Sequence, residues 1–290
     1  APKYASAQFM VNDRAAVTEG EFWGYVDRTG KMVIDAKFDL VGDFHYGLAN
    51  VRVAASKKYA LIDRQGRYVV EPVYDFIAGF TEDRAAFIGP DLGGYFDLQG
   101  SKVLTNVVSA APFSEGLGAV LVTVGTIGFV DRAGDFAFKA KFSSSGDFHE
   151  GLAYARTAAG KVGFVNRQGK TVIAAKFDDG RRFSEGMAAV SLNGKFGFTD
   201  RKGDWQIKPK FDTADYDGFR NGVAIVNVGA KIDSYGNAEG GRWGAIDTTG
   251  EWIIKPVFEN LYHADGLILG WTNQQRTYFR PDGRIVATEG

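Results

Sequence analysis

Few residues of this 290-residue chain have the types and spacing that metal binding requires. The histidines are His45, His149 and His263, and none has a second histidine at the short spacing that places two imidazoles on one metal ion. His45 and His149 occupy the same place in the phrase Asp-Phe-His-x-Gly-Leu, which is typical of a turn. We therefore expect neither a metal site nor a bound cofactor.

Candidate acid–base and nucleophilic groups give an equally weak signal. The phrase Asp-x-x-Gly supplies many carboxylates, but an aspartate repeated at one fixed place is typical of turn capping, in which the side chain accepts hydrogen bonds from the turn backbone. The chain has no cysteine, and it contains no Gly-x-Ser-x-Gly elbow, Walker phosphate loop or dinucleotide fingerprint. The Gly-rich segment 236–241 is not followed by Lys-Ser or Lys-Thr, so we interpret it as a loop. We predict no catalytic residues.

The Asp-x-x-Gly phrase belongs to an internal repeat. It recurs about every 34–36 residues, and only the interval from Gly203 to Gly250 is clearly longer. An aromatic-Gly pair such as Trp23-Gly24 often precedes it, and a second turn, such as Phe183-Ser-Glu-Gly186, follows it. The chain therefore consists of about eight copies of one unit. The phrases are Asp27–Gly30, Asp63–Gly66, Asp97–Gly100, Asp131–Gly134, Asn166–Gly169, Asp200–Gly203, Asp247–Gly250 and the degraded Arg280–Gly283.

Each unit has the pattern of short β-strands. Apolar residues alternate with period two, and glycine interrupts them too often for a helix. The Asp-x-x-Gly turn predicts a hairpin, for example between residues 23–27 and 31–38. Pro72, Pro209 and Pro256 lie in the strand after this turn, which predicts an edge strand because proline cannot donate to a ladder. Apolar residues on both faces of that strand indicate sheets stacked face to face.

The repeated phrases resemble the bacterial WG-repeat family over about residues 8 to 287. The resemblance rests on phrases such as Phe196-Gly-Phe-Thr-Asp200, Ile207-Lys-Pro-Lys-Phe211 and Phe183-Ser-Glu-Gly186. It is weak around Gly93–Asp97 and weakest around Thr277–Arg280. The family implies β-rich repeats, often in exported or surface proteins, and implies no reaction.

These units predict an all-β protein of small antiparallel blades. Eight blades closing into a β-propeller would cover both blade faces and leave no exposed edges, and we favour this ring over the alternative, an open β-solenoid with capping ends. We expect a lead at 1–7, a single repeat domain at 8–287 with an insertion at 228–242, and a tail at 288–290.

Composition narrows the partners and the location. Lys plus Arg number 34 and Asp plus Glu number 35, so no strong positive field attracts nucleic acid. No apolar run approaches the roughly 20 residues of a membrane helix. The opening Ala1-Pro2-Lys3 is compatible with a mature end after signal cleavage, so we expect export, with a cytoplasmic protein as the alternative.

The insertion is the first candidate for a binding element, because insertions in repeat proteins often lie on the binding face. The alternative is a tolerated surface loop. Two aromatics near the irregular end could stack on a sugar, although core packing is the competing interpretation. The candidate binding residues are Lys231, Asp233, Tyr235, Asn237 and Glu239 of the insertion, together with Tyr262 and Trp271.

We therefore expect a non-catalytic repeat scaffold with a loop-lined recognition surface for a protein or cell-surface partner. A glycan or cell-wall binding module is the first alternative, and a propeller-type glycosidase with paired carboxylates is the second. In a four-stranded meander, the turns that carry Arg28, Arg64, Arg132, Arg167 and Arg201 and those that carry Glu115, Glu150 and Glu185 share one rim. The insertion is expected on the opposite rim, which we predict to be the recognition face.

Overall fold

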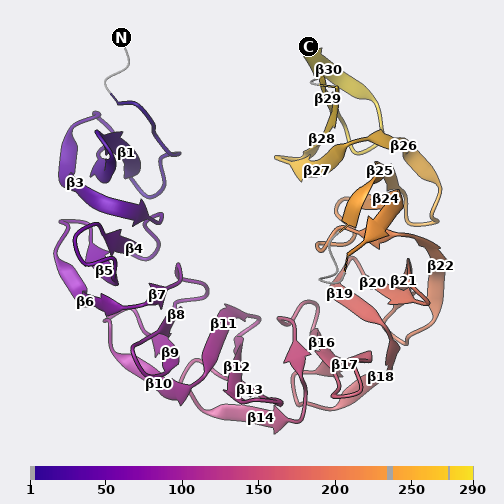
Figure 1. Cartoon of the computed structure of the whole chain (residues 1–290), viewed down its shortest axis with the longest axis horizontal. Coiled ribbons are helices and arrows are strands. Elements are labelled where there is room, and N and C mark those ends of the chain that lie inside the picture. Colours follow the sequence, from indigo (N-terminus) through magenta and orange to yellow (C-terminus); the bar gives the residue numbers. More distant parts are fainter. Residues whose placement is uncertain (1–3, 234–237, 274, 290) are drawn as a thin grey trace. The chain divides into compact units, whose positions relative to one another are not determined.

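The computed structural model describes residues 4–233, 238–273 and 275–289, which form strands and turns and contain no helix (Figure 1). This described part of the chain thus holds no helix of the length and hydrophobicity that crossing a membrane requires. The chain divides into two compact units, Ala1–Lys141 and Phe142–Gly290. Each unit is built from the antiparallel sheets that the repeats predict.

The first unit contains, among its described residues, one six-stranded sheet and two four-stranded sheets. The strands of the six-stranded sheet, in order, are β1 (Ala15–Glu19), β2 (Phe22–Val26), β3 (Met32–Val41), β4 (Leu48–Val53), β5 (Tyr59–Asp63) and β6 (Tyr68–Tyr74). The four-stranded sheets consist of β7 (Phe76–Ile77), β8 (Ala85–Ile88), β9 (Gly93–Phe96) and β10 (Lys102–Val107), and of β11 (Ser109–Ser114), β12 (Leu117–Thr123), β13 (Thr126–Val130) and β14 (Phe136–Ala140).

The second unit contains four four-stranded sheets within its described residues. The first two consist of β15 (Ser144–Ser145), β16 (Leu152–Arg156), β17 (Val162–Asn166) and β18 (Thr171–Phe177), and of β19 (Asp179–Ser184), β20 (Met187–Leu192), β21 (Lys195–Asp200) and β22 (Trp205–Phe211). The last two consist of β23 (Thr213–Ala214), β24 (Ala224–Ile232), β25 (Ala238–Ile246) and β26 (Trp252–Phe258), and of β27 (Asn260–Ala264), β28 (Leu267–Thr272), β29 (Gln275–Phe279) and β30 (Ile285–Glu289).

Each four-stranded sheet is a meander in chain order, which confirms the predicted blade. The proline-bearing strands β6, β22 and β26 are all at sheet edges, as the prolines predict.

The first two repeats depart from this pattern of separate four-stranded sheets. Strand β3 pairs with β2 along its first half and with β4 along its second half, so these repeats share one sheet.

The glycine of the aromatic-Gly pair has a packing role that the pattern alone did not explain. In the blade β19–β22, Phe196 pairs with Phe211 and Phe198 pairs with Ile207, so the edge strand bulges opposite Gly197. A Cβ atom on Gly197 would lie 2.7 Å from the nitrogen of Pro209. In this blade the bulged strand therefore occupies the space that the glycine leaves.

The hydrophobic core lies between successive blades as well as within them. Phe177 and Phe211, which end their edge strands, are almost fully buried. The ring of Phe177 contacts Trp205 of the following blade edge-on at 5.5 Å, and Phe211 contacts Trp252 in the same way at 5.8 Å. Both faces of these blades are therefore covered, as the apolar pattern predicts.

Candidate functional site

The aspartates of the Asp-x-x-Gly phrases are turn caps, as predicted. The Asp200 carboxylate accepts hydrogen bonds from the backbone nitrogens of Lys202 at 2.8 Å and Asp204 at 3.0 Å. Gly203 has φ +90°, in the left-handed region that favours glycine. At Asp27, a hydrogen bond from the Thr29 hydroxyl lowers the pKa of the carboxyl group, because it stabilises the charged form. The hydrogen bonds of the turns hold these carboxylates in place.

The second type of turn contacts its neighbour in the next blade through a glutamate. The Glu150 carboxylate accepts a hydrogen bond from the Gly186 nitrogen at 3.0 Å, and Glu185 accepts one from the Gly222 nitrogen at 2.8 Å. Arg201 of an Asp-x-x-Gly turn donates to the Glu150 carbonyl at 2.6 Å. Both kinds of turn therefore share one edge of the blades, which we call the turn rim.

The first unit repeats this arrangement. The Arg132 guanidinium lies 3.4 Å from the Glu82 carboxylate, and Glu82 accepts a hydrogen bond from the Gly116 nitrogen at 2.7 Å. The predicted placement of the arginine and glutamate turns on one rim is thus confirmed in each unit. These ion pairs are half exposed, so each contributes under about 1 kcal/mol.

The insertion lies at the opposite end of its blade. Strand β25 begins in the insertion and ends at the Asp247 turn, so the insertion and the turn rim are at its two ends. We call this end of the blades, which carries the β20–β21-type hairpins and the connections between blades, the hairpin rim. The sequence predicted an insertion at 228–242 and a loop at 236–241. The loop is wrong for residues 238–241, which belong to β25, and residues 236–237 lie outside the described residues. Because Ala230 pairs with Gly240 and Ile232 with Ala238, the insertion extends β24 and β25.

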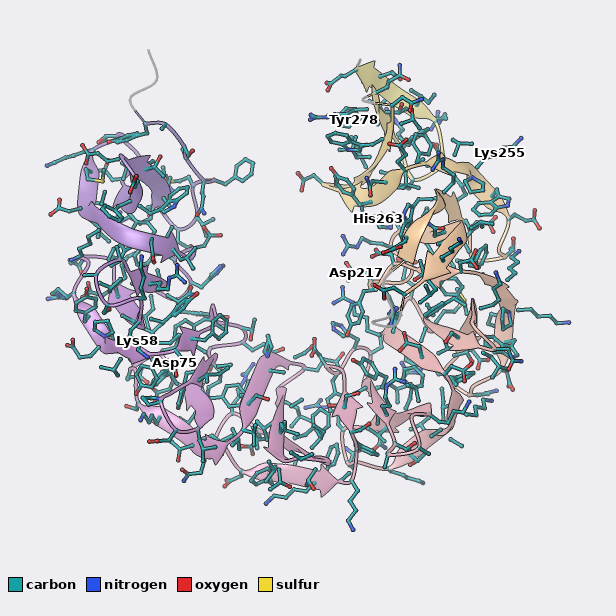
Figure 2. The ribbon with its side chains drawn as sticks, in the orientation of Figure 1. Lys58, Asp75, Asp217, Lys255, His263 and Tyr278 are labelled. Carbon is teal, nitrogen blue, oxygen red and sulfur yellow. The ribbon has the colours of Figure 1, made fainter. Side chains whose placement is uncertain are left out.

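Lysine–aspartate pairs repeat along the hairpin rim. Lys58 lies 2.5 Å from Asp75 (Figure 2), and Lys161 lies 2.5 Å from Asp178. Lys195 pairs with Asp212 in the same way. The hydrogen bond from Lys161 lowers the pKa of the Asp178 carboxyl group, because the cation stabilises the charged form. These pairs fix the connections between blades.

A cavity of about 570 Å³ opens on the hairpin rim of the second unit. This volume is within the roughly 300–1,000 Å³ of small-molecule sites. Three consecutive blades and the insertion contribute its walls. The lining residues are Arg156, Asp178, Asp179, Arg181, Ser191, Gly194, Phe196, Asp212, Thr213 and Ile232.

Asp179 organises the charges of this cavity. Its carboxylate accepts hydrogen bonds from Arg156 and from Arg181, each at 2.6 Å. The Arg181 guanidinium lies over the Phe196 ring at 5.0 Å from its centroid. Both guanidinium groups are therefore held in fixed positions before any ligand arrives.

The carboxylates of the cavity are poorly suited to glycoside hydrolysis. A general acid needs a raised pKa, whereas Lys161 lowers the pKa of Asp178. Asp179 is paired with two arginines and Asp212 with Lys195. The arrangement suits polar recognition better than proton transfer.

The predicted site residues are dispersed. Lys231 and Glu239 are exposed and directly paired on the extended hairpin, and Asp233 is half-buried next to them. Tyr235 and Asn237 lie outside the described residues. Tyr262 is exposed on β27, whereas Trp271 is half-buried on β28 with the Arg276 guanidinium 4.3 Å from its ring centroid.

Sequence reasoning missed the cavity residues, although two signals were present. The lysine–aspartate pairs recur at a fixed separation of 17 residues. The fifth residue after the second turn is large in most repeats, as in Arg52, Leu121, Arg156 and Trp271, but it is Ser191 here. The small Ser191 side chain leaves the space that the cavity occupies. Ile232, which belongs to the predicted insertion, forms part of the cavity wall.

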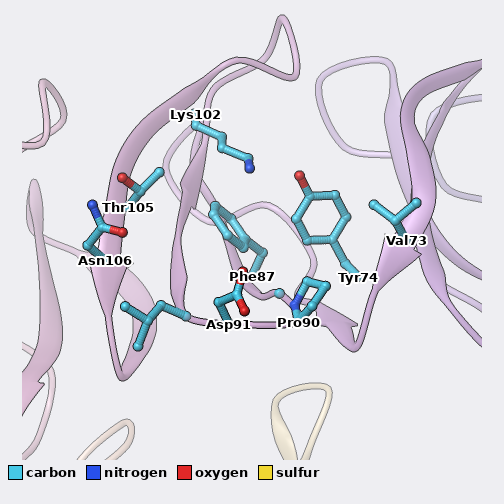
Figure 3. A pocket seen from close by; sticks show the side chains of 10 residues that line it. Val73, Tyr74, Phe87, Pro90, Asp91, Lys102, Thr105 and Asn106 are labelled. Carbon is cyan, nitrogen blue, oxygen red and sulfur yellow. The ribbon is translucent and has the colours of Figure 1, made fainter.

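The first unit has a smaller cavity of about 230 Å³ (Figure 3). Tyr74, Phe87 and the 89–92 connection form part of its wall, and Lys102 points toward the two rings. The Lys102 amino group lies 5.4 Å from the Tyr74 ring centroid and 5.6 Å from that of Phe87. Its cation is therefore already engaged by the protein.

The sequence profile of the family described as "WG containing repeat" matches residues 23–54, 59–87, 127–158, 163–196, 196–231 and 243–266. The stretch 88–126, where the resemblance is weak, has no match, yet it folds into β-strands like the others. No curated protein matches the chain.

Two solved structures are similar in fold. One is described as the eukaryotic initiation factor, with 11% identity, a TM-score of 0.64, and coverage of 99% of this chain and 87% of that one. The other is BamB from Moraxella catarrhalis, with 13% identity, a TM-score of 0.50, and coverage of 99% and 98%. At these identities the likeness concerns the fold alone.

Proposed function

The chain belongs to the WG-repeat family, and from this premise we propose that it is a non-catalytic scaffold whose hairpin rim binds a protein or cell-surface partner. The observation that carries the proposal is the contrast between the rims. The turn rim repeats short, hydrogen-bonded turns. The hairpin rim carries the insertion and the cavity of the second unit. Variable connections on a rigid scaffold are the usual place for recognition.

Within this proposal the blades close into a β-propeller ring, with an open solenoid as the alternative. Successive blades pack through contacts such as Phe177–Trp205 and Phe211–Trp252, and closure would in addition cover the two end faces that an open array must cap. Small-angle X-ray scattering of the full chain tests it. A compact ring gives a radius of gyration of about 19 Å, and a clearly larger value would favour the solenoid.

The partner-binding role is tested by shortening the insertion. Replacing residues 229–241 by Asn-Gly removes the extended part of β24 and β25 and keeps the rest of the blade. We expect partners identified by affinity capture, and then purified, to bind the full chain and to lose binding to the shortened chain. Arg201→Ala on the turn rim is the matched control and should bind normally. Equal loss in both variants, or normal binding by the shortened chain, would contradict the rim assignment.

A glycan or cell-wall ligand is the second candidate, favoured by the polar lining of the larger cavity. A glycan array with the full chain separates it from a protein partner. Binding to a defined glycan that the shortened chain no longer recognises would identify the hairpin rim as a carbohydrate site.

A further inference from the structure

The cavity on the hairpin rim of the second unit has hydrogen-bonding groups that the protein leaves unused. Ser191 and Thr213 are only 4% and 8% exposed. Neither hydroxyl makes a hydrogen bond to the rest of the described chain, although both line the cavity. Neither hydroxyl is sealed off from the cavity. Both are therefore available to hydrogen-bond with a polar ligand there.

The cationic groups of the cavity specify the charge of that ligand. Arg181 uses one terminal nitrogen for Asp179, and its Nε and other terminal nitrogen make no hydrogen bond within the described residues. The carboxylates are more fully engaged. Asp178 accepts from Lys161 and from the Asn193 nitrogen, and Asp179 accepts from two arginines. Asp212, the third carboxylate of the lining, accepts from Lys195 and from the Gly229 nitrogen. Every carboxylate oxygen of the lining thus already accepts a hydrogen bond, whereas Arg181 keeps charged donors unused, which favours an anionic group such as a carboxylate.

The other lining residues indicate which class of molecule the ligand carboxylate belongs to. Ser191 is on β20 and Thr213 on β23, so the hydroxyls approach from two blades. Phe196 and Ile232 add apolar surface between the polar groups. An acidic amino-acid side chain would reach Arg181, but only the peptide backbone beside it could pair with Ser191 and Thr213. A sugar acid offers a carboxylate, several hydroxyls and an apolar C–H face together.

We infer that this cavity binds a hexuronate unit of an acidic polysaccharide. The inference rests on the proposed recognition role of the hairpin rim and names its ligand. Arg181 donates to the uronate carboxylate, Ser191 and Thr213 exchange hydrogen bonds with ring hydroxyls, and the ring C–H face contacts Ile232.

The chain itself supplies a substitution that fills the cavity. At the place of Ser191 an earlier repeat has Arg52, which donates to Asp39 at 2.8 and 3.0 Å. Asp178 occupies the place of Asp39 in the blade of Ser191. Ser191→Arg should therefore place a guanidinium beside Asp178 and occupy the cavity while the blade stays folded. Leu121→Arg puts the same residue at the equivalent place in the first unit and is the matched control.

Isothermal titration of the full chain with trigalacturonate, the neutral galactose trimer of the same linkage and hexaglutamate tests the inference. We expect trigalacturonate to bind, the neutral trimer to bind at least about tenfold more weakly, and Ser191→Arg to lose at least about tenfold in affinity for trigalacturonate, because charge-assisted hydrogen bonds are lost. Leu121→Arg should bind like the unaltered chain.

Equal binding of the two sugars, stronger binding of hexaglutamate, no binding of any probe, or normal binding by Ser191→Arg would overturn the uronate assignment. The circular-dichroism melting curve of Ser191→Arg checks its fold. If that variant unfolds, Arg181→Gln replaces it with the same expected loss. Failure of trigalacturonate with retained binding of a captured partner would reject the uronate alone, whereas loss of both would reject the proposed function.

Discussion

The two rims of the blades are built on different principles. On the turn rim, backbone conformation dictates the residues: Asp200 caps its own turn and Gly203 has a positive φ. On the hairpin rim, side-chain pairs such as Lys161 and Asp178 fix the connections, and the backbone tolerates an extended hairpin. This repeat protein therefore keeps its fold through one rim and varies its surface through the other.

The largest effect is expected where the backbone itself is crowded. Gly197→Ala should destabilise the fold by about 1–3 kcal/mol, because the added methyl group meets the bulged edge strand. Urea unfolding of the variant measures this. The second repeat has the buried Ala60 at the equivalent place. We therefore expect the blade of Gly197→Ala to accommodate the methyl group and to stay folded. Ala60→Gly is the control, with a loss of about 0.5–1 kcal/mol; a larger loss there than at Gly197 would reject the packing explanation.

A smaller effect is expected for the turn glycines, and it should depend on their neighbours. Gly30→Ala introduces only the cost of a positive φ, about 1 kcal/mol, since open space surrounds that glycine. Gly203→Ala should cost more, because its methyl group would lie 2.9 Å from Ile173 of the preceding blade. The melting midpoints of the two variants measure this difference in stability. Equal midpoints for the unaltered chain and Gly203→Ala would show that the turn is assigned wrongly.

On the hairpin rim the effect is expected to depend on pH. A hydrogen bond from Arg52 lowers the pKa of Asp39 to about 2. The folded state holds this carboxyl group charged, so its contribution to stability is present above pH 4 and is lost as the pH falls toward 2. Asp39→Asn should therefore reduce the acid sensitivity of the melting temperature between pH 4 and 2. Parallel melting curves for both proteins would contradict this.

The smallest effect is expected for the ion pairs of the turn rim. Arg201 and Glu150 are 49% and 34% exposed and lie 3.5 Å apart. Arg201→Ala should change stability by under about 1 kcal/mol. Urea unfolding in low and high salt provides the test, and a loss well above about 1 kcal/mol would contradict this expectation. Only the salt-dependent part of the loss belongs to the ion pair, because Arg201 also donates to the Glu150 carbonyl.

The repeat, the blades and the turn chemistry could be predicted from the sequence, because each depends on local pattern. Asp-x-x-Gly specifies a turn with few alternatives, and Pro209 specifies an edge strand. The extension of β24 and β25 could not be predicted, since the insertion lacks alternating apolar residues. The cavity could not be predicted from the local sequence pattern either. It depends on the small Ser191 among neighbours from other blades, and only a comparison of equivalent repeat positions would have drawn attention to it.

The shared strand β3 has a consequence for how the chain comes apart. Repeats at the ends of an array are joined by the backbone to a neighbour on one side only, and they open first. At the amino-terminal end, however, a single ten-residue strand belongs to both of the first two repeats. Opening the first repeat would therefore strain the backbone ladder of the second, so the two should exchange amide hydrogens as one cooperative block. The carboxyl-terminal blade β27–β30 has no such strand shared with β23–β26, and its exposed β30 should be the first to exchange.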